Sequence, residues 1–160
     1  MSLTNYQQAV QIINTDKDRS HFVGPRTDDL ISKAEEATGF KFTGMYRDFL
    51  KNYGAGSFEG GEIYGIIDDN FEDSGIPDAV WVTLNERRKI NLPANLLIIY
   101  DIGTGEYYCL DFEKLNNDKE PKVVSFYPGF DLEIQTYEII ADDFGDFLLD
   151  TVNIGLSDEE

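Results

Sequence analysis

The chain has one histidine and one cysteine, the residue types that most often provide a catalytic base or nucleophile. His21 lies in a polar segment before Gly24-Pro25, which is typical of an exposed loop histidine. Cys109 lies inside the apolar run 107–110, where a thiol is typical of a small buried hydrophobic residue. We therefore expect no catalytic residue of either type and predict that the protein is not an enzyme.

Carboxylates are abundant, and segment 68–73 resembles the oxygen-rich start of a calcium-binding loop. That template requires glycine at its sixth position and a bidentate glutamate at its twelfth, where this chain has Asp73 and Ala79. We therefore predict no metal and no other cofactor. A metal-dependent hydrolase built from carboxylates is an alternative that metal titration would test, because 31 acidic residues allow many pairings.

The acidic residues are concentrated in two long segments that lack basic residues. Residues 52–86 carry eight carboxylates and no lysine, arginine or histidine, and the last thirty residues carry ten carboxylates with no basic residue after Lys122. The formal net charge is -18, whereas a magnitude of about 2 to 8 keeps a small domain soluble. Such a charge repels nucleic acid and attracts cations, so we predict a basic macromolecule as partner and no nucleic acid.

Ten of these carboxylates are candidates for contact with that partner. They are Glu59, Glu62, Asp68, Asp69, Glu72, Asp73, Asp142, Asp143, Asp146 and Asp150. Asp142 and Asp143 also suit the first turn of a helix, where the helix dipole favours anions. Asp146 and Asp150 lack such a structural reason, because like charges four residues apart on a helix repel each other. A merely solvated acidic face is an equally good interpretation of this pattern.

The length and composition predict one folded domain over residues 1–160 that contacts no membrane. Of the 160 residues 41% are hydrophobic and 13% are aromatic, which is too apolar for a disordered acidic chain. The longest apolar run, 96–100, is far too short to cross a bilayer, and the N-terminus has no basic segment followed by an apolar one. A single cysteine suits a reducing compartment, so we expect a cytoplasmic protein.

Apolar spacing and capping residues predict five helices and four strands. The expected helices cover residues 3–13, 28–38, 43–53, 77–89 and 141–152, and the expected strands cover 62–67, 96–100, 107–110 and 122–127. Thr27 is a good N-cap and Gly39 a good C-terminal stop for the second helix. The apolar run 96–100 is typical of a central strand and should form an antiparallel hairpin with 107–110. Residues 1–26 should form an N-terminal helix and loop, and residues 153–160 an acidic tail.

Several segments between residues 28 and 152 share their order and spacing with a known family. These segments are 30–38, 42–50, 52–54, 92–99, 101–111 and 141–148. Together they resemble the SUKH superfamily, which contains yeast cell-wall-synthesis regulators and many bacterial immunity proteins, and 101–111 is the best single motif. Phe42-Thr43 stands where the family usually has Leu-Pro, and Asn52-Tyr53-Gly54 where it has Asn-Gly-Gly, which should alter only local turns.

This resemblance implies a single α+β domain with helices packed on a largely antiparallel β-sheet and a C-terminal helix. It also implies no cofactor, no catalytic constellation, and a role in neutralising a toxin, often a nuclease, by direct binding. The likeness and the charge together predict a cytoplasmic bacterial immunity protein, or antitoxin, that binds a cognate secreted toxin through an acidic surface. The partner we expect is a basic nuclease domain.

Aromatic residues within the acidic segment are candidate anchors for such a contact, because binding hot spots are enriched in tryptophan and tyrosine. Tyr64, Phe71 and Trp81 have this position, although each also suits the hydrophobic core. The alternative function is a regulatory scaffold that recruits a cellular protein without inhibiting it. The sequence leaves the oligomeric state open.

Overall fold

A computed structural model of the chain describes residues 2–157, and those residues contain five α-helices, one 3₁₀ helix and seven strands. In chain order these are α1 (Ser2–Thr15), β1 (Ser20–Phe22), α2 (Asp28–Thr38), α3 (Gly44–Asn52), β2 (Gly56–Phe58), β3 (Gly61–Ile63), α4 (Ala79–Ile90), β4 (Leu96–Asp101), β5 (Tyr107–Leu115), β6 (Pro121–Phe126), η1 (Leu132–Ile134), β7 (Ile139–Ala141) and α5 (Phe144–Ser157). This confirms the predicted α+β domain with a C-terminal helix.

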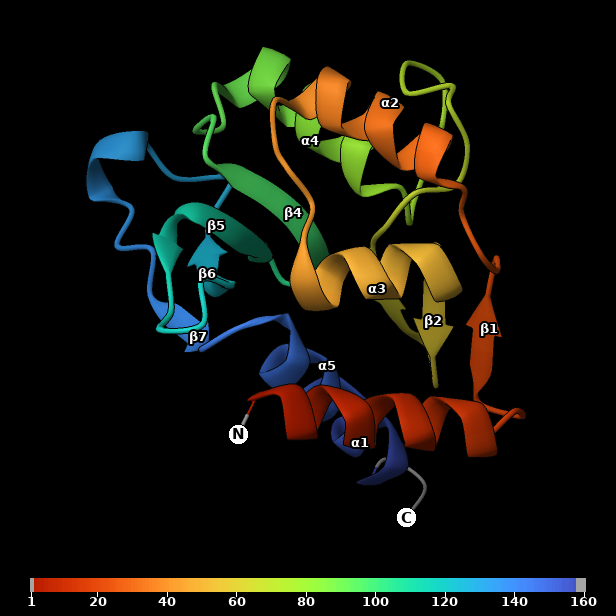
Figure 1. The fold of residues 1–160 in the computed structure, drawn as a ribbon. Helices are drawn as coiled ribbons and strands as arrows, with labels where there is room; N and C mark the ends of the chain where they lie inside the picture. Colours follow the sequence, from red (N-terminus) through yellow and green to blue (C-terminus); the bar gives the residue numbers. More distant parts are fainter. Residues whose placement is uncertain (1, 158–160) are drawn as a thin grey trace.

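The strands form two antiparallel sheets where we expected one, in the orders β1-β2-β3 and β4-β5-β6-β7. The sheets meet between β3 and β4, because the backbone N–H of Tyr64 donates to the carbonyl of Ile99 with an N···O distance of 2.9 Å. Figure 1 shows α2 and α4 together at one end of the molecule, α1 and α5 together at the opposite end, and α3 between them. Helices therefore enclose the sheets from both ends.

The apolar run 96–100 forms β4, but β4 is the first strand of its sheet and not a central one. Its residues 96–99 are nevertheless fully buried. The helix α4 covers the outer edge of β4, where the backbone N–H of Ile98 donates to Thr83 Oγ1 at 3.0 Å. Helix α4 and the neighbouring sheet thus bury this edge, which explains an apolar pattern typical of a central strand. The predicted hairpin with β5 is confirmed.

The caps of α2 are confirmed, whereas α4 begins two residues later than predicted. In α2, Thr27 Oγ1 accepts a hydrogen bond from the third residue of the helix, and Gly39 ends it with a φ of 84°. Pro77 lies outside α4, and Asp78 is its N-cap, because one carboxylate oxygen of Asp78 accepts backbone hydrogen bonds at 2.9 and 3.1 Å. Asp78 is fully buried, and this burial raises the pKa of its carboxyl.

The last helix also differs from its prediction at both ends. Residues 139–141 form β7, and α5 begins at Phe144 after the cap residue Asp143, whose carboxylate accepts a hydrogen bond from the N–H of Asp146 at 3.0 Å. The helix continues to Ser157, so residues 153–157 are helical where we expected an acidic tail. The rest of that expected tail, 158–160, lies outside the described residues.

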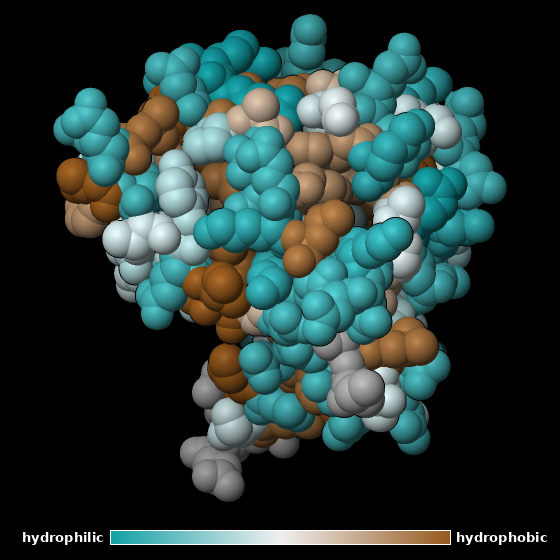
Figure 2. Space-filling view, turned by 60° about the vertical axis from the view of Figure 1, so that its left-hand side comes forward, coloured by the Kyte–Doolittle hydropathy of each residue, from teal (hydrophilic) through white to brown (hydrophobic). Residues whose placement is uncertain are grey.

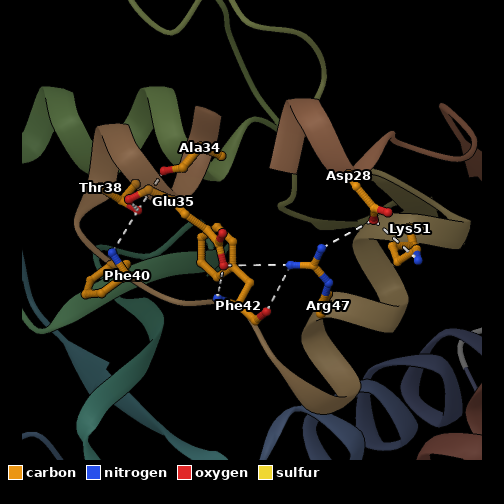
Figure 3. A network of polar contacts seen from close by, with 8 residues as sticks. All are labelled: Asp28, Ala34, Glu35, Thr38, Phe40, Phe42, Arg47 and Lys51. Atoms are coloured by element: carbon orange, nitrogen blue, oxygen red, sulfur yellow. Dashed lines mark hydrogen bonds and ion pairs between the residues drawn. The ribbon is translucent and has the colours of Figure 1, made fainter. Parts of the chain in front are cut away.

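A network of polar contacts holds α3 against α2 (Figure 3). Glu35 accepts a hydrogen bond from the N–H of Phe42 at 2.7 Å and lies 3.7 Å from Arg47. Arg47 also pairs with Asp28 at 3.3 Å, and Lys51 lies at the same distance from that carboxylate. The hydrogen bond from Lys51 is the main reason that the pKa of Asp28 is lowered. These contacts tie both ends of α2 to the following helix.

The first turn of α3 is capped from a distant part of the chain. Glu120, in the turn between β5 and β6, accepts a hydrogen bond from the N–H of Met45 through Oε1 at 3.1 Å. The preceding residue is Gly44, with a φ of 60°, and a Cβ atom there would overlap the Glu120 carboxylate. Burial, and to a lesser extent nearby carboxylates, raise the pKa of Glu120.

Replacing this carboxyl by an amide should change how stability depends on pH. Because the folded-state pKa of Glu120 is raised, its contribution to stability is complete below the unfolded pKa and is lost as pH rises through the folded pKa. We therefore expect the wild type to gain stability relative to Glu120→Gln as pH falls from about 7 to about 4, as measured by urea unfolding. The control is Glu113→Gln at an exposed position, and a stability difference between wild type and Glu120→Gln that is constant with pH would contradict the prediction.

Candidate protein-binding surfaces

The first predicted contact region, loop 68–73, is exposed beside α2, in yellow-green at the upper right of Figure 1. Its four carboxylates are all exposed: Asp68, Asp69, Glu72 and Asp73. Asp69 lies 3.5 Å from Lys33 of α2, an ion pair in which both side chains are more than half exposed. The other three make no ion pair with any residue that the structure describes. This loop therefore carries three carboxylates without an internal counter-charge.

Glu59 and Glu62 lie on the hairpin formed by β2 and β3. Glu59 forms an ion pair with Arg19 at 3.2 Å, and Arg19 also pairs with Asp16. The side chain of Glu59 lies against the Cα of Gly155, so the hairpin packs on the last helix. Glu59 thus has a structural role, whereas Glu62 is exposed.

Asp142 and Asp143 lie where α5 begins and differ in accessibility. Asp143 is fully buried and caps the helix, so its side chain is not accessible to a partner protein. Its second oxygen and a carboxylate oxygen of the exposed Asp142 accept hydrogen bonds from Asn116 Nδ2 at 3.2 and 3.1 Å. The amide of Asn116 therefore joins the turn between β5 and β6 to the start of α5.

Asp146 and Asp150 also differ from each other. Asp146 accepts a hydrogen bond from Asn5 Nδ2 of α1 at 2.9 Å, so it has the structural role that its sequence pattern did not reveal. Asp150 is exposed in the middle of α5, because the helix continues to Ser157. Desolvation and, after it, the nearby Asp146 raise the pKa of Asp150.

Charge reversal at these two aspartates should have opposite effects on stability. Asp150→Lys replaces a like-charge pair by an attractive one and should raise the free energy of unfolding by about 0.5 kcal/mol. Asp146→Lys removes the acceptor of the Asn5 hydrogen bond and should lower it by about 1 kcal/mol. Urea unfolding of both variants would measure this difference, and equal effects of the two substitutions would contradict it.

The predicted carboxylates therefore do not form one surface. Loop 68–73 lies at the end of the molecule that carries α2, and α5 lies at the opposite end beside α1 (Figure 1). Exposed candidates without an ion pair to a described residue are Glu62, Asp68, Glu72, Asp73, Asp142 and Asp150. Loop 68–73 and the face of α5 therefore remain two separate predicted contact regions.

The connection between β6 and β7 exposes large hydrophobic side chains that our sequence reasoning missed. They are Phe130 (58% exposed), Leu132 (40%) and Ile134 (62%), and Ile139 (53%) follows at the start of β7. The signal was present as apolar residues after Pro128-Gly129, in a stretch with neither helical nor strand periodicity. Figure 2 shows that hydrophobic side chains emerge at several separate places on an otherwise hydrophilic face. Exposed groups of large apolar residues are typical of interaction sites.

This connection is ordered by one glutamine side chain. Gln135 Nε2 donates to the carbonyls of Tyr127 at 2.6 Å and Phe130 at 3.1 Å, and Gln135 Oε1 accepts from the N–H of Tyr127 at 2.9 Å. The rings of Tyr127 and Phe130 stack with centroids 5.5 Å apart. Because Asp131 and Glu133 are exposed within the same segment, it presents ordered apolar residues among carboxylates.

The three aromatic residues that we predicted as candidate anchors all lie in or against the hydrophobic core. Tyr64 is only 2% exposed, and its carbonyl accepts a hydrogen bond from Tyr46 Oη at 2.9 Å. Phe71 and Trp81 are half-buried and pack against the hydrophobic core. Tyr64 is therefore a core residue, whereas Phe130, Leu132 and Ile134 in the connection between β6 and β7 are exposed.

Cys109 and His21 were the candidates for catalysis, and the carboxylates were the candidates for metal binding. Cys109 is fully buried, and burial raises the pKa of its thiol. His21 is exposed, as expected, but in the strand β1 and not in a loop. Within residues 2–157 the structure has no group of three or more histidine, cysteine, aspartate or glutamate side chains that could hold a metal ion. In the same residues no helix combines the length and hydropathy needed to cross a membrane.

Comparison with protein families gives a match over most of the chain. The matching family model is SUKH_5, described as SMI1-KNR4 cell-wall, and it covers residues 6–153. This range includes most of α1, which lies before the segments that carried the resemblance in the sequence. No curated protein matches the chain.

Proposed function

We propose that this chain, which belongs to the SUKH superfamily, is a bacterial immunity protein that binds and neutralises a cognate toxin in the cytoplasm. The observation that carries the proposal is loop 68–73, where three exposed carboxylates have no counter-charge among the described residues. Membership of a superfamily that includes immunity proteins supports it, and we propose the Bacillus antitoxin YobK as the member that the chain resembles in particular. Inhibition would result from binding alone, without a catalytic step.

A nuclease domain is the toxin class that this charge suits best. A nuclease needs a basic cleft for its polyanionic substrate, and an acidic protein is attracted by the same field. Electrostatic steering of this kind raises association rates by about 10 to 1000-fold and weakens steeply with salt. A protein bound in the cleft would exclude the nucleic acid.

Short-range affinity requires apolar contact as well, because protein interfaces have an apolar core within a polar rim. The exposed residues Phe130 and Ile134, with Asp131 and Glu133 beside them, have this composition. The hydrogen bonds of Gln135 hold the segment in one conformation, which lowers the entropy lost on binding. This segment is therefore a second contact region in the proposal.

A regulatory scaffold is the alternative function, and the description of the matching family as SMI1-KNR4 cell-wall favours it. A scaffold would bind a cellular protein without inhibiting it. The experiment that separates the two is expression of the neighbouring gene's product in cells with and without this chain. Rescue from toxicity together with co-purification supports the immunity function, and co-purification without toxicity supports the scaffold.

Amide substitutions in loop 68–73 should slow association with the toxin. The test variant combines Asp68→Asn, Glu72→Gln and Asp73→Asn, and leaves Asp69 to its ion pair with Lys33. We expect an association rate about tenfold lower at low salt, a flatter salt dependence and nearly unchanged thermal stability, because the three side chains are exposed. Stopped-flow association at several salt concentrations measures both quantities.

The matched control removes three exposed carboxylates from other parts of the chain. Its substitutions are Asp18→Asn, Glu36→Gln and Glu113→Gln. The control has the same net charge as the test variant, so it separates a local contact from the total charge. Equal association rates for the two variants would remove loop 68–73 from the interface.

A further inference from the structure

The strand β7 forms one edge of the sheet β4-β5-β6-β7, and its outer side is open to a further strand (Figure 1). Among residues 2–157, β7 pairs only with β6. The opposite edge of this sheet differs, because α4 covers β4 and Thr83 Oγ1 accepts the N–H of Ile98. An uncovered edge strand presents unpaired main-chain N–H and C=O groups. Neither our sequence reasoning nor the proposed toxin contacts included this edge.

Ile139 is the residue of β7 whose main-chain groups point away from β6. The carbonyl of the preceding residue, Glu138, accepts a hydrogen bond from the N–H of Ser125 in β6 at 2.9 Å. In an antiparallel pair, residues bonded in this way alternate with residues whose N–H and C=O point to the other side. Ile139 lies opposite Val124 and is of the second kind. Because its side chain is also exposed, it offers a donor, an acceptor and an apolar surface in one place.

The connection that leads into β7 adds exposed apolar side chains and is well ordered. Phe130, Leu132 and Ile134 are exposed in it, and the hydrogen bonds of Gln135 hold their main chain. Just before β7, the ring of Tyr137 stacks on Phe126 with centroids 6.2 Å apart. An edge that is ordered before binding loses less entropy when a partner pairs with it.

The charge around β7 indicates which kind of chain can pair with it. Exposed carboxylates lie before, beside and after the strand, and the sequence has no basic residue after Lys122. They are Asp131, Glu133, Glu138 and Asp142, and none of them has an ion pair with a residue that the structure describes. Edge-to-edge pairing of two copies would bring these carboxylates together, and like charges on paired strands are destabilising. A basic segment is attracted instead.

We propose that β7 binds an extended segment of the toxin as an added antiparallel strand, in which lysine or arginine alternates with apolar residues. In strand addition, main-chain hydrogen bonds provide affinity and the alternating side chains provide specificity. An apolar residue of the segment lies opposite Ile139 and exchanges both main-chain hydrogen bonds with it. The basic residues then lie on the other face, which is the face of Glu138, because successive side chains of a strand alternate. The choice of the toxin as the source of the segment rests on the proposed function.

The test uses the purified chain and an acetylated, amidated hexapeptide in which lysine and valine alternate. Hydrogen exchange at the amide of Ile139 is followed by NMR in ¹⁵N-labelled protein at low salt. We expect saturable binding with a Kd on the order of 1 mM, and exchange at Ile139 that is about tenfold slower in the complex. The amide of Ser125, which is already bonded to Glu138, is the internal reference and should not change.

A hexapeptide with three lysines followed by three valines is the matched control, because its charge and composition are the same but it lacks the alternation. It should leave exchange at Ile139 unchanged. Equal protection by both peptides would show non-specific attraction and overturn the proposal. Absence of protection by the alternating peptide at millimolar concentration would overturn it too. Protection that rises with protein concentration without any peptide would identify a second copy as the occupant, which also overturns it.

Methylation of the peptide nitrogens tests the main-chain pairing without changing the protein. N-methylation of the valines removes the donors to the Ile139 carbonyl and should weaken binding at least about tenfold. N-methylation of the lysines, whose N–H groups point away from β7, is the control and should weaken it less. Equal effects of the two modifications would contradict the proposed pairing.

Two substitutions test the same contact from the side of the protein. Ile139→Pro removes the outward N–H, which an edge strand tolerates, and should weaken peptide binding about tenfold. Ile139→Val keeps both the N–H and an apolar side chain, so it should bind like the wild type. Binding by the proline variant that equals that of the valine variant would overturn the proposal.

The titration contains no toxin, so it separates this inference from the proposed function. Peptide binding at Ile139 in a chain that fails to neutralise the product of its neighbouring gene supports strand addition and removes the toxin as the source of the strand. Full neutralisation of a toxin by the Ile139→Pro chain overturns strand addition and leaves the proposed function standing. The two conclusions therefore fail independently.

Discussion

Three helices of this domain start on buried or nearly buried carboxylates, and the rest of the structure depends on these caps. Asp78 caps α4, Asp143 caps α5 and Glu120 caps α3. A buried charge is tolerated only where hydrogen-bond donors meet it, and the unpaired N–H groups of a helix N-terminus provide such donors. Glu120 lies in the turn between β5 and β6, and Asn116 of the same turn holds Asp143, so two of the caps also join helices to the sheet through this turn.

These caps explain why total charge is a poor guide to the functional surface. The net charge of -18 includes carboxylates that hold the fold together and carboxylates that have no partner within the described residues. Asp143 and Asp146 belong to the first kind, and Glu72 and Asp73 to the second. Only the second kind is available to a cationic partner without loss of an internal contact. An electrostatic docking surface is thus defined by missing internal partners and not by the density of acidic residues.

The sequence predicted the elements whose signals are local. Thr27 and Gly39 bound α2 as expected, and the hairpin of β4 and β5 has the expected partners, because caps and turn residues act on their immediate neighbours. The strands β1, β2 and β7 were missed, since three residues are too few to establish a period. Pro77 was predicted to be the first residue of α4 because proline suits that position, but the buried carboxylate of Asp78 caps the helix, which begins at Ala79.

The amino-acid sequence by itself determined the fold class, the superfamily and the strongly acidic character, all of which follow from periodicity, motif order and composition. Only the tertiary structure decided which carboxylates are available. Asp146 meets Asn5 across 141 positions of sequence, and Glu120 meets Met45 across 75. Such partners are brought together by packing of helices on sheets, which no local pattern encodes, and so the uncovered edge at Ile139 appears only in the folded chain.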